Sequence, residues 1–320
     1  MKVCVTGAAG FVGHHLVRSL KRRGYWVRAV DYRPPEWPTG ADEVNWQCDL
    51  RDLNNAMQAL RGIDEVYALA ADMGGMGFIS QYHYWILVNN ARINLNTAMA
   101  ACAMSTRRLL YTSSACVYPE GLQLTIETHG LAETDAWQGK PDTAYGVEKL
   151  IAEDIYRRLA EEAGTVVRIS RFHNIYGQEG TWDGGREKAP AALCRKVAEA
   201  KLAGKHQIEV WGDGLQTRSF CHISDCLTML YRLMRSDYDR PLNIGTDRAV
   251  SINELAQIIG DVAGWPVELV HVDGPQGVRG RNADLSEMKR VLDYEPQVSL
   301  EDGMAELYTW IEEQVRHAAR

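Results

Sequence analysis

The chain begins with Lys2-Val3-Cys4-Val5-Thr6, followed directly by Gly7-Ala8-Ala9-Gly10-Phe11-Val12-Gly13. The first segment predicts a strand, and the residues from about His14 to Arg23 predict a helix. Glycines between a strand and a helix permit a tight turn and let the backbone approach a pyrophosphate at the helix N-terminus. The stretch therefore predicts a dinucleotide site, whose residues would be Gly7, Gly10, Phe11, Val12 and Gly13.

A carboxylate follows at a position that suits the ribose of the dinucleotide. A second predicted strand, Trp26–Val30, leads to Asp31, close to the expected offset of about 20 residues from the glycines. Asp31 favours NAD over NADP, because a carboxylate repels a 2′-phosphate. Because Arg33 lies nearby, NADP stays possible as the cofactor. The alternative interpretation of Asp31 is an ordinary turn residue at the end of a strand. Asp49 is expected near the adenine, and the expected cofactor-binding residues also include Ala70, at the end of a predicted strand, together with Tyr145 and Lys149.

Strand and helix patterns alternate along the first half of the chain. Strands are expected at residues 43–46, 65–70, 109–111 and 166–169, and helices at 53–60, 89–103 and from 145 onward. Such alternation implies an α/β protein with a Rossmann-type, doubly wound parallel sheet. The expected domains are an NAD-binding domain of residues 1–172 and 223–247, and a smaller mixed α/β substrate domain of residues 173–222 and 248–320.

The alternation loosens in the second half. Pro190 suits the first turn of a helix, and Ser251 with Glu254 three residues later predicts a capped helix start. Helices are expected at residues 190–202, 225–234, 252–262 and 300–315, and strands at 208–211 and 241–244. The helix at 225–234 and the strand at 241–244 are expected to return to the first domain.

The composition disfavours several classes of protein. The 320 residues are 46% apolar and 24% charged, and the net charge of -7 argues against sequence-independent nucleic-acid binding. No run of about 18 apolar residues predicts a membrane span, and the first strand begins too early for a signal peptide. Seven cysteines without a C-x-x-C pair predict reduced thiols in a cytoplasmic protein, and no metal site is expected.

The candidate catalytic residues lie downstream of the glycine motif. Ser114 follows a predicted strand, and Tyr145 and Lys149 are four residues apart, on one face of a predicted helix. An ammonium beside a phenol stabilises the phenolate and should lower the pKa of Tyr145, and Ser114 is placed to donate to the same oxygen. These residues suit removal of a proton from an alcohol whose hydride passes to the dinucleotide. The alternative is that Tyr145 and Lys149 are simply neighbours on a helix surface. The predicted dinucleotide site disfavours this alternative.

With the glycine motif, Asp31, Ser114, Tyr145 and Lys149 in this order, the chain resembles the extended short-chain dehydrogenase/reductase family. The segment Trp211-Gly212-Asp213-Gly214-Leu215-Gln216-Thr217-Arg218-Ser219-Phe220 is similar to the sugar-nucleotide signature of that family. Further segments, spread over nearly the whole chain, resemble members that epimerise GDP-mannose at C3 and C5. They are Ala71-Asp72-Met73-Gly74-Gly75-Met76-Gly77-Phe78, Ser113-Ser114-Ala115-Cys116-Val117-Tyr118-Pro119, Arg171-Phe172-His173-Asn174-Ile175-Tyr176-Gly177, Gly184-Gly185-Arg186-Glu187-Lys188-Ala189-Pro190 and Gly277-Val278-Arg279-Gly280-Arg281-Asn282.

The resemblance implies an NAD-dependent isomerase that acts on a GDP-sugar and gives GDP-L-galactose, GDP-L-gulose or both. Hydride leaves C4 for NAD, the 4-ketone acidifies the protons at C3 and C5, and the returning hydride leaves the cofactor unchanged. The resemblance also implies a homodimer through the helices near residues 89–103 and 145–159.

The same resemblance implies roles for individual residues. Cys116 would be the base and Lys188 the acid; from the residues alone, an inert buried thiol and a solvated lysine are the alternatives. A diphosphate calls for cations, and arginines suit it through bidentate hydrogen bonds. The implied substrate-binding residues are Gly74, Gly75, Met76, Ser114, Cys116, Asn174, Glu187, Lys188, Ala189, Lys196, Gln216, Thr217, Arg218 and Arg281.

Two other interpretations stay open at this point. One is a different NAD-dependent nucleotide-sugar enzyme that uses the same 4-keto intermediate, namely a 4-epimerase, dehydratase or decarboxylase. The other is an NAD-binding regulatory protein without catalysis, which the complete set of Ser114, Tyr145 and Lys149 disfavours. A related GDP-sugar, such as a heptose, is also open as the substrate.

Overall fold

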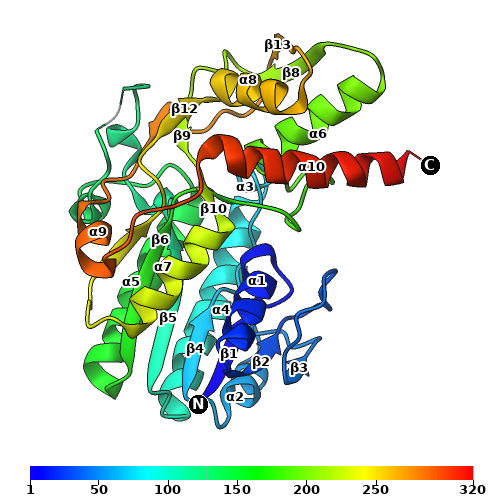
Figure 1. Ribbon diagram of the computed structural model, residues 1–320. Coiled ribbons are helices and arrows are strands. Elements are labelled where there is room, and N and C mark those ends of the chain that lie inside the picture. Colours follow the sequence, from blue (N-terminus) through cyan, green and yellow to red (C-terminus); the bar gives the residue numbers. More distant parts are fainter. Residues whose placement is uncertain (128, 320) are drawn as a thin grey trace.

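A seven-stranded sheet forms the centre of the computed structural model, which describes residues 1–127 and 129–319 (Figure 1). Its strands are β1 (Lys2–Thr6), β2 (Trp26–Val30), β3 (Glu43–Asn45), β4 (Glu65–Ala68), β5 (Arg108–Ser114), β6 (Val166–Phe172) and β11 (Pro241–Ile244). They lie in the order β11-β6-β5-β4-β1-β2-β3, and every neighbouring pair is parallel. The predicted doubly wound parallel sheet is confirmed.

Helices cover both faces of this sheet. They are α1 (Phe11–Arg22) and α7 (Ile223–Arg235) on one face, and α2 (Leu53–Leu60), α4 (His83–Ala103) and α5 (Ala144–Ala163) on the other. Successive strand residues point to opposite faces, so Val3 and Val5 of β1 enter the core with α1 and α7, whereas Cys4 enters the core with α2, α4 and α5. Because both faces are covered, the middle residues of these strands are mostly buried and apolar, as in parallel strands generally.

A smaller group of elements lies beyond the carboxyl ends of the large sheet (Figure 1). Helices α6 (Ala189–Leu202), α8 (Ile252–Ala263) and α10 (Leu300–Ala318) share a separate apolar core. Two small sheets accompany them: β8 (Gln207–Trp211) with β13 (Glu268–Val272), and β9 (Thr217–Ser219) between β12 (Ala249–Ser251) and β14 (Gly280–Arg281). The remaining elements are α3 (Met76–Gln81), β7 (Ile175–Tyr176), β10 (Cys221–His222), α9 (Ser286–Leu292) and the 3₁₀ turns η1 (Ala115–Val117), η2 (Glu120–Leu122) and η3 (Glu133–Trp137). Helix α7 and strand β11 return to the large sheet, as predicted.

Several element boundaries differ from the sequence predictions. Helix α1 begins at Phe11 rather than near His14, and α4 begins at His83 rather than Asn89. Strand β5 continues through Ser114, beyond the apolar residues that predicted it. The last residues of β5 are polar, but they form hydrogen bonds to buried groups. For example, the Ser113 hydroxyl donates to Glu153 at 2.5 Å. A hydrophobicity pattern misses such positions because it treats polar residues as exposed.

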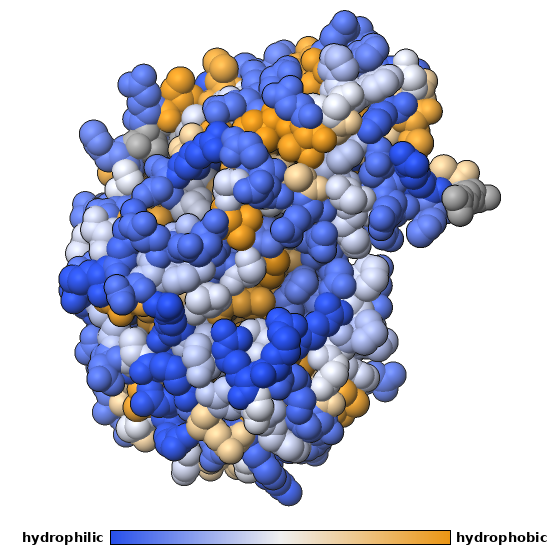
Figure 2. All heavy atoms as spheres, viewed as in Figure 1, coloured by the Kyte–Doolittle hydropathy of each residue, from blue (hydrophilic) through white to orange (hydrophobic). Residues whose placement is uncertain are grey.

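The outer surface is mixed in character. Figure 2 shows mainly polar and charged side chains on the face viewed, with hydrophobic side chains gathered in patches on its upper half and in the middle. Within residues 1–127 and 129–319, no helix combines the length and the apolar character needed to span a bilayer.

A buried ion pair joins α5 to the central sheet. Arg171, near the end of β6, donates to both carboxylate oxygens of Glu153 at 2.9 and 2.7 Å, and each side chain is at most 2% exposed. Ser113 of β5 donates to the same carboxylate. Buried charges need partners of this kind, because desolvation makes an unpaired charge very costly.

We predict that Glu153→Gln lowers the free energy of unfolding by about 3–5 kcal/mol, because it leaves the Arg171 guanidinium buried without a counter-charge. Chemical denaturation measures this loss. The matched control is Glu161→Gln on the same helix, where the carboxylate is half exposed beside Arg158 and should contribute less than about 1 kcal/mol. Equal losses in the two variants would contradict the prediction.

Candidate active site

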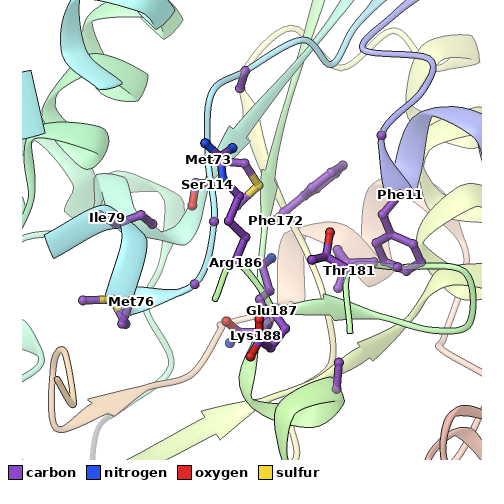
Figure 3. A pocket seen from close by; sticks show the side chains of 18 of the residues that line it. Phe11, Met73, Met76, Ile79, Ser114, Phe172, Thr181, Arg186, Glu187 and Lys188 are labelled. Atoms are coloured by element: carbon purple, nitrogen blue, oxygen red, sulfur yellow. The ribbon is translucent and has the colours of Figure 1, made fainter. Parts of the chain in front are cut away.

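A cavity of about 740 Å³ lies at the carboxyl edge of the large sheet, against the smaller group of elements. Its lining comes from turns after β1, β2, β4 and β5, and from α5, α6, β9 and β14. Ligands of open parallel sheets bind at this edge. Figure 3 shows Ser114, Phe172, Lys188 and Phe11 entering this pocket from different elements.

The glycine turn forms one end of the cavity. A Cβ at Gly13 would overlap the carbonyl oxygen of Gly7, so only glycine lets α1 start this close to β1. Gly10 is the N-cap and has no side chain to bind the first amides of α1. The helix N-terminus is therefore able to receive a pyrophosphate, and the residues present fit a dinucleotide.

Asp31 lies beside this turn at the end of β2. Its carboxylate accepts from the backbone N–H of Ala9 at 3.0 Å and is only 8% exposed. Burial raises its pKa, whereas the hydrogen bonds from Ala9 and Arg33 oppose that shift. Asp49 also lines the cavity, but Arg51 binds both of its oxygens at 2.7–3.1 Å, a pairing that the sequence did not indicate.

Ser114, Tyr145 and Lys149 meet in the middle of the cavity wall. Lys149 donates to the carbonyl of Thr112 at 2.9 Å, and its Nζ lies 5.6 Å from the centroid of the Tyr145 ring. A Cβ at Gly146 would overlap the carbonyl oxygen of Cys116, so this glycine lets the first turn of α5 approach the end of β5. The helical spacing of Tyr145 and Lys149 thus brings both side chains to the strand end, as predicted.

The sequence predicted a lowered pKa for Tyr145, and the net direction of that prediction is wrong. The pKa of Tyr145 is raised, first because the phenol is buried and then because Cys116 and Glu148 lie nearby, while a hydrogen bond with Ser114 opposes the rise. Burial lowers the pKa of Lys149, although Glu148 and Glu153 oppose that shift. Burial therefore sets the direction of the shift in the pKa of Tyr145, and the Lys149 ammonium does not reverse it.

Cys116 and Lys188 line the same cavity. Cys116 lies in η1, where its backbone N–H donates to Ser114 Oγ at 3.1 Å. Arg281 Nη1 donates to its Sγ at 3.3 Å, so the charge beside the thiol comes from an arginine as well as from lysine. Lys188 is the N-cap of α6; burial lowers its pKa, and the nearby Cys116 partly offsets the shift.

Two arginines on neighbouring strands form a basic end to the cavity. Arg218 of β9 and Arg281 of β14 are register partners, and burial together with the charge of Arg281 lowers the pKa of Arg218. Within the described ranges, Arg281 Nη2 is buried without a hydrogen-bond partner, although Asp142 Oδ2 lies 3.8 Å away, and Gln216 Oε1 is also buried without a partner. Two arginine charges beside a single carboxylate, with a buried donor that makes no hydrogen bond, fit an anionic ligand such as a diphosphate.

Most of the predicted site residues line this one cavity. The set comprises Gly7, Gly10, Phe11, Val12, Gly13, Asp31, Asp49, Ala70, Gly74, Gly75, Met76, Ser114, Cys116, Tyr145, Lys149, Asn174, Glu187, Lys188, Ala189, Lys196, Gln216, Arg218 and Arg281. Thr217 is the one predicted site residue that does not line the cavity. Its hydroxyl instead donates to the carbonyl of Ile126 at 2.9 Å.

Sequence reasoning missed two groups of side-chain contacts, one next to residues that line the cavity and one among the lining residues themselves. His14, His15 and Arg18 of α1 hold Gln178 and Glu179; for example, His14 Nε2 lies 3.0 Å from the Glu179 carboxylate. The paired histidines after the glycine motif were the only signal of this contact. The contacts of Arg186 with Asp72 and Phe78 were also missed, because an arginine in a glycine-rich segment looks like a surface residue.

A model of the NAD dependent epimerase/dehydratase family matches residues 3–245. The chain belongs to this family. Over 318 residues it is 44% identical to a GDP-mannose 3,5-epimerase of Arabidopsis thaliana, covering 98% of this chain and 83% of that protein. The solved complex of MoeE5 with UDP-glucuronic acid and NAD is 29% identical, with a TM-score of 0.83 over 98% of this chain and 100% of that one. UDP-glucose 4-epimerase of Thermotoga maritima, at 22% identity, shares the fold, with a TM-score of 0.87 over 98% and 100% of the two chains.

Membership of the NAD dependent epimerase/dehydratase family confirms the prediction of an NAD-dependent enzyme. The Gly13 turn and Asp31 are the residues that would hold this cofactor.

We predict that Asp31→Ala weakens NAD binding by roughly 10- to 100-fold, because charge-assisted hydrogen bonds to the ribose contribute about 1.5–3 kcal/mol. Binding of NADP should weaken less, since the carboxylate no longer repels a 2′-phosphate. Titration calorimetry with both nucleotides measures the two changes, with Asp261→Ala on α8, away from the cavity, as the control. Equal loss of NAD and NADP affinity would contradict the assignment.

Proposed function

We propose that the protein epimerises GDP-mannose at C5 and C3 through a transient 4-ketone, giving GDP-L-galactose, GDP-L-gulose or both. The observation that carries the proposal is an acid–base pair, Cys116 and Lys188, in the same cavity as Ser114, Tyr145 and Lys149. A 4-epimerase needs only the second set, because it removes and returns hydride at a single carbon. The 44% identity to the Arabidopsis thaliana enzyme over nearly the whole chain supports the same activity.

Tyr145 removes the proton of the sugar 4-hydroxyl and later returns it. NAD, when bound, would supply a reversible hydride acceptor for C4. Ser114 donates toward the same oxygen, and Lys149 lies one helical turn away with its ammonium fixed by the carbonyl of Thr112. The raised pKa of Tyr145 suits its reverse role, in which the phenol returns the proton to the 4-oxygen.

Cys116 and Lys188 act on the carbons that flank the ketone. The ketone acidifies the protons at C3 and C5, and inversion needs a base on one side and an acid on the other. Arg281 fixes the direction of the Cys116 thiol by donating to Sγ. The lowered pKa of Lys188 makes it a stronger acid than an ordinary lysine, which suits proton donation to the opposite side.

Arg218, Arg281 and Lys196 would bind the nucleotide diphosphate. The two arginines are adjacent across β9 and β14. Lys196 also lines the cavity, and its Nζ donates to the carbonyl of Glu209 at 2.8 Å. Gln216 adds a buried carbonyl oxygen whose partner would come from the ligand. Because Arg281 also donates to Cys116 Sγ, a diphosphate held by these arginines would fix the hexose beside the proposed base.

The proposed function is tested by incubating the purified protein with GDP-mannose and identifying products by NMR. Formation of GDP-L-galactose or GDP-L-gulose without net NADH supports the proposal. A product inverted only at C4, a dehydrated sugar or unchanged GDP-mannose would overturn it.

We predict that Cys116→Ala lowers the epimerisation rate by about 10²–10⁴-fold, or roughly 3–5 kcal/mol, because general-base catalysis is lost. Hydride transfer at C4 should persist because Tyr145 is intact, so NADH absorbance should still develop with GDP-mannose. The control is Cys102→Ala, an exposed thiol outside the cavity. Near-normal turnover of Cys116→Ala would remove the thiol from the mechanism.

We further propose a homodimer through α4 and α5. Trp85, Leu95 and Met99 of α4 and Ile151 of α5 are each 46–59% exposed, which leaves an apolar surface on two helices that pack together. We predict that Leu95→Glu gives monomers in sedimentation velocity, whereas Leu202→Glu, at a similarly exposed leucine of α6, does not. A dimer that survives Leu95→Glu would contradict this interface.

The division into an NAD-binding domain of residues 1–172 and 223–247 and a substrate domain of residues 173–222 and 248–320 is likewise proposed. Separate apolar cores support it, although α9 packs in the core of the large sheet. The cytoplasmic location remains a prediction from the sequence.

A further inference from the structure

Two loops meet at the mouth of the cavity, and we call them the mouth loops. One is residues 72–75, which follows β4 and leads into α3; the other is residues 184–188, which leads into α6. The backbone N–H of Gly75 donates to the carbonyl of Arg186 at 3.0 Å. A Cβ at Gly75 would overlap the carbonyl oxygen of Glu187, so the two backbones are in direct contact. This contact lies two residues from Lys188.

The Arg186 side chain spans the two mouth loops. Its guanidinium carbon lies 3.8 Å from the centroid of the Phe78 ring, and its Nη1 lies 3.3 Å from Asp72 Oδ1. The side chain is 44% exposed, which places it at the mouth rather than deep in the cavity. Figure 3 shows Arg186 beside Met73, above Lys188 and Glu187. Arg186 thus adds a cation–π contact and an ion pair to the backbone hydrogen bond.

A chain of polar contacts continues from the mouth to the cofactor end. Asn89 of α4 donates to Asp72 at 3.2 Å and accepts from Arg51 at 3.0 Å. Arg51 in turn pairs with Asp49, the residue expected near the adenine. The position of Asp72 under Arg186 is therefore fixed from both sides.

We propose that Arg186 is a positioning residue that keeps the mouth loops closed over the sugar and retains the ketone intermediate until hydride returns. The proposal rests on the proposed function and specifies how that site holds its intermediate. Arg186 acts through Gly75 on one side of the mouth and Lys188 on the other.

Retention matters because the intermediate is formed by a redox step. When the C4–H hydride has passed to NAD⁺ and the hydroxyl proton to Tyr145, the sugar is a neutral ketone and the cofactor is NADH. If the ketone leaves at this stage, the protein keeps the two electrons as NADH and cannot begin another cycle with an alcohol. Loss of the closed mouth should therefore appear as inactivation that progresses with turnover.

The main variant is Arg186→Gln, which removes both the ion pair and the cation over the ring. With GDP-mannose, we expect the KM to rise about tenfold, as loss of roughly one such contact implies, while the initial kcat changes less than about threefold. NADH absorbance should build up toward one equivalent per active site as activity declines. Arg186→Lys restores a charge beside Asp72 and should recover part of both effects.

The matched control is Arg248→Gln, which removes an exposed arginine ion-paired with Glu301 away from the cavity. It should behave as the wild type. If Arg186→Gln shows wild-type KM and no turnover-dependent NADH, the proposal is overturned. A fall in kcat and thermal stability without NADH accumulation would also overturn it, since that result describes a purely structural residue.

Hydrogen–deuterium exchange tests the closed mouth without any turnover. Arg186→Gln should speed exchange of the Gly75 amide, which the Arg186 carbonyl protects, at least about tenfold in peptides covering residues 72–78. Unchanged exchange there would overturn the proposal whatever the substrate is. Absence of GDP-mannose turnover by the wild type, with faster exchange in the variant, would instead reject the proposed function and leave Arg186 as the closing residue.

Discussion

The buried ion pair between Glu153 and Arg171 is the interaction on which the geometry of the proposed active site depends. Glu153 lies on α5 one turn after Lys149, and its carboxylate binds Arg171 of β6 and Ser113 of β5. One side chain therefore fixes the helix that carries the tyrosine and lysine against the strand that ends in Ser114. A small shift of α5 would separate these groups, and catalysis is sensitive to displacements of about 1 Å.

Close backbone approaches provide the second constraint. At Gly13, Gly75 and Gly146, a Cβ would overlap a carbonyl oxygen of another segment. These contacts bring together the cofactor turn, the mouth of the cavity and the junction between α5 and Cys116, respectively. At each of these three glycines, two backbone segments lie so close that a Cβ would not fit between them. This close approach lets the proposed redox residues and the proposed acid–base residues line one cavity.

The sequence predicted the order of strands and helices, because hydrophobic patterns and glycine turns are local properties. All but one of the candidate site residues line the cavity. Tyr145 and Lys149 were found because they share a helix face, and the glycines because they share a turn, whereas most substrate residues came from the family resemblance. The sequence did not predict which distant side chains meet. Arg281 and Cys116 are 165 residues apart, and no local pattern relates them. The net effect on the pKa of Tyr145 was also missed, because burial depends on the packing of the whole fold.

The central claim is that one cavity combines reversible oxidation at C4 with proton exchange at its two neighbours. The most direct measurement is the position of deuterium in GDP-sugars recovered after incubation of GDP-mannose with the protein in D₂O. We expect deuterium at C5, deuterium at C3 as well in any GDP-L-galactose, and none at C4, because the hydride returns from the bound cofactor rather than from solvent. Deuterium at neither C3 nor C5 would contradict the account.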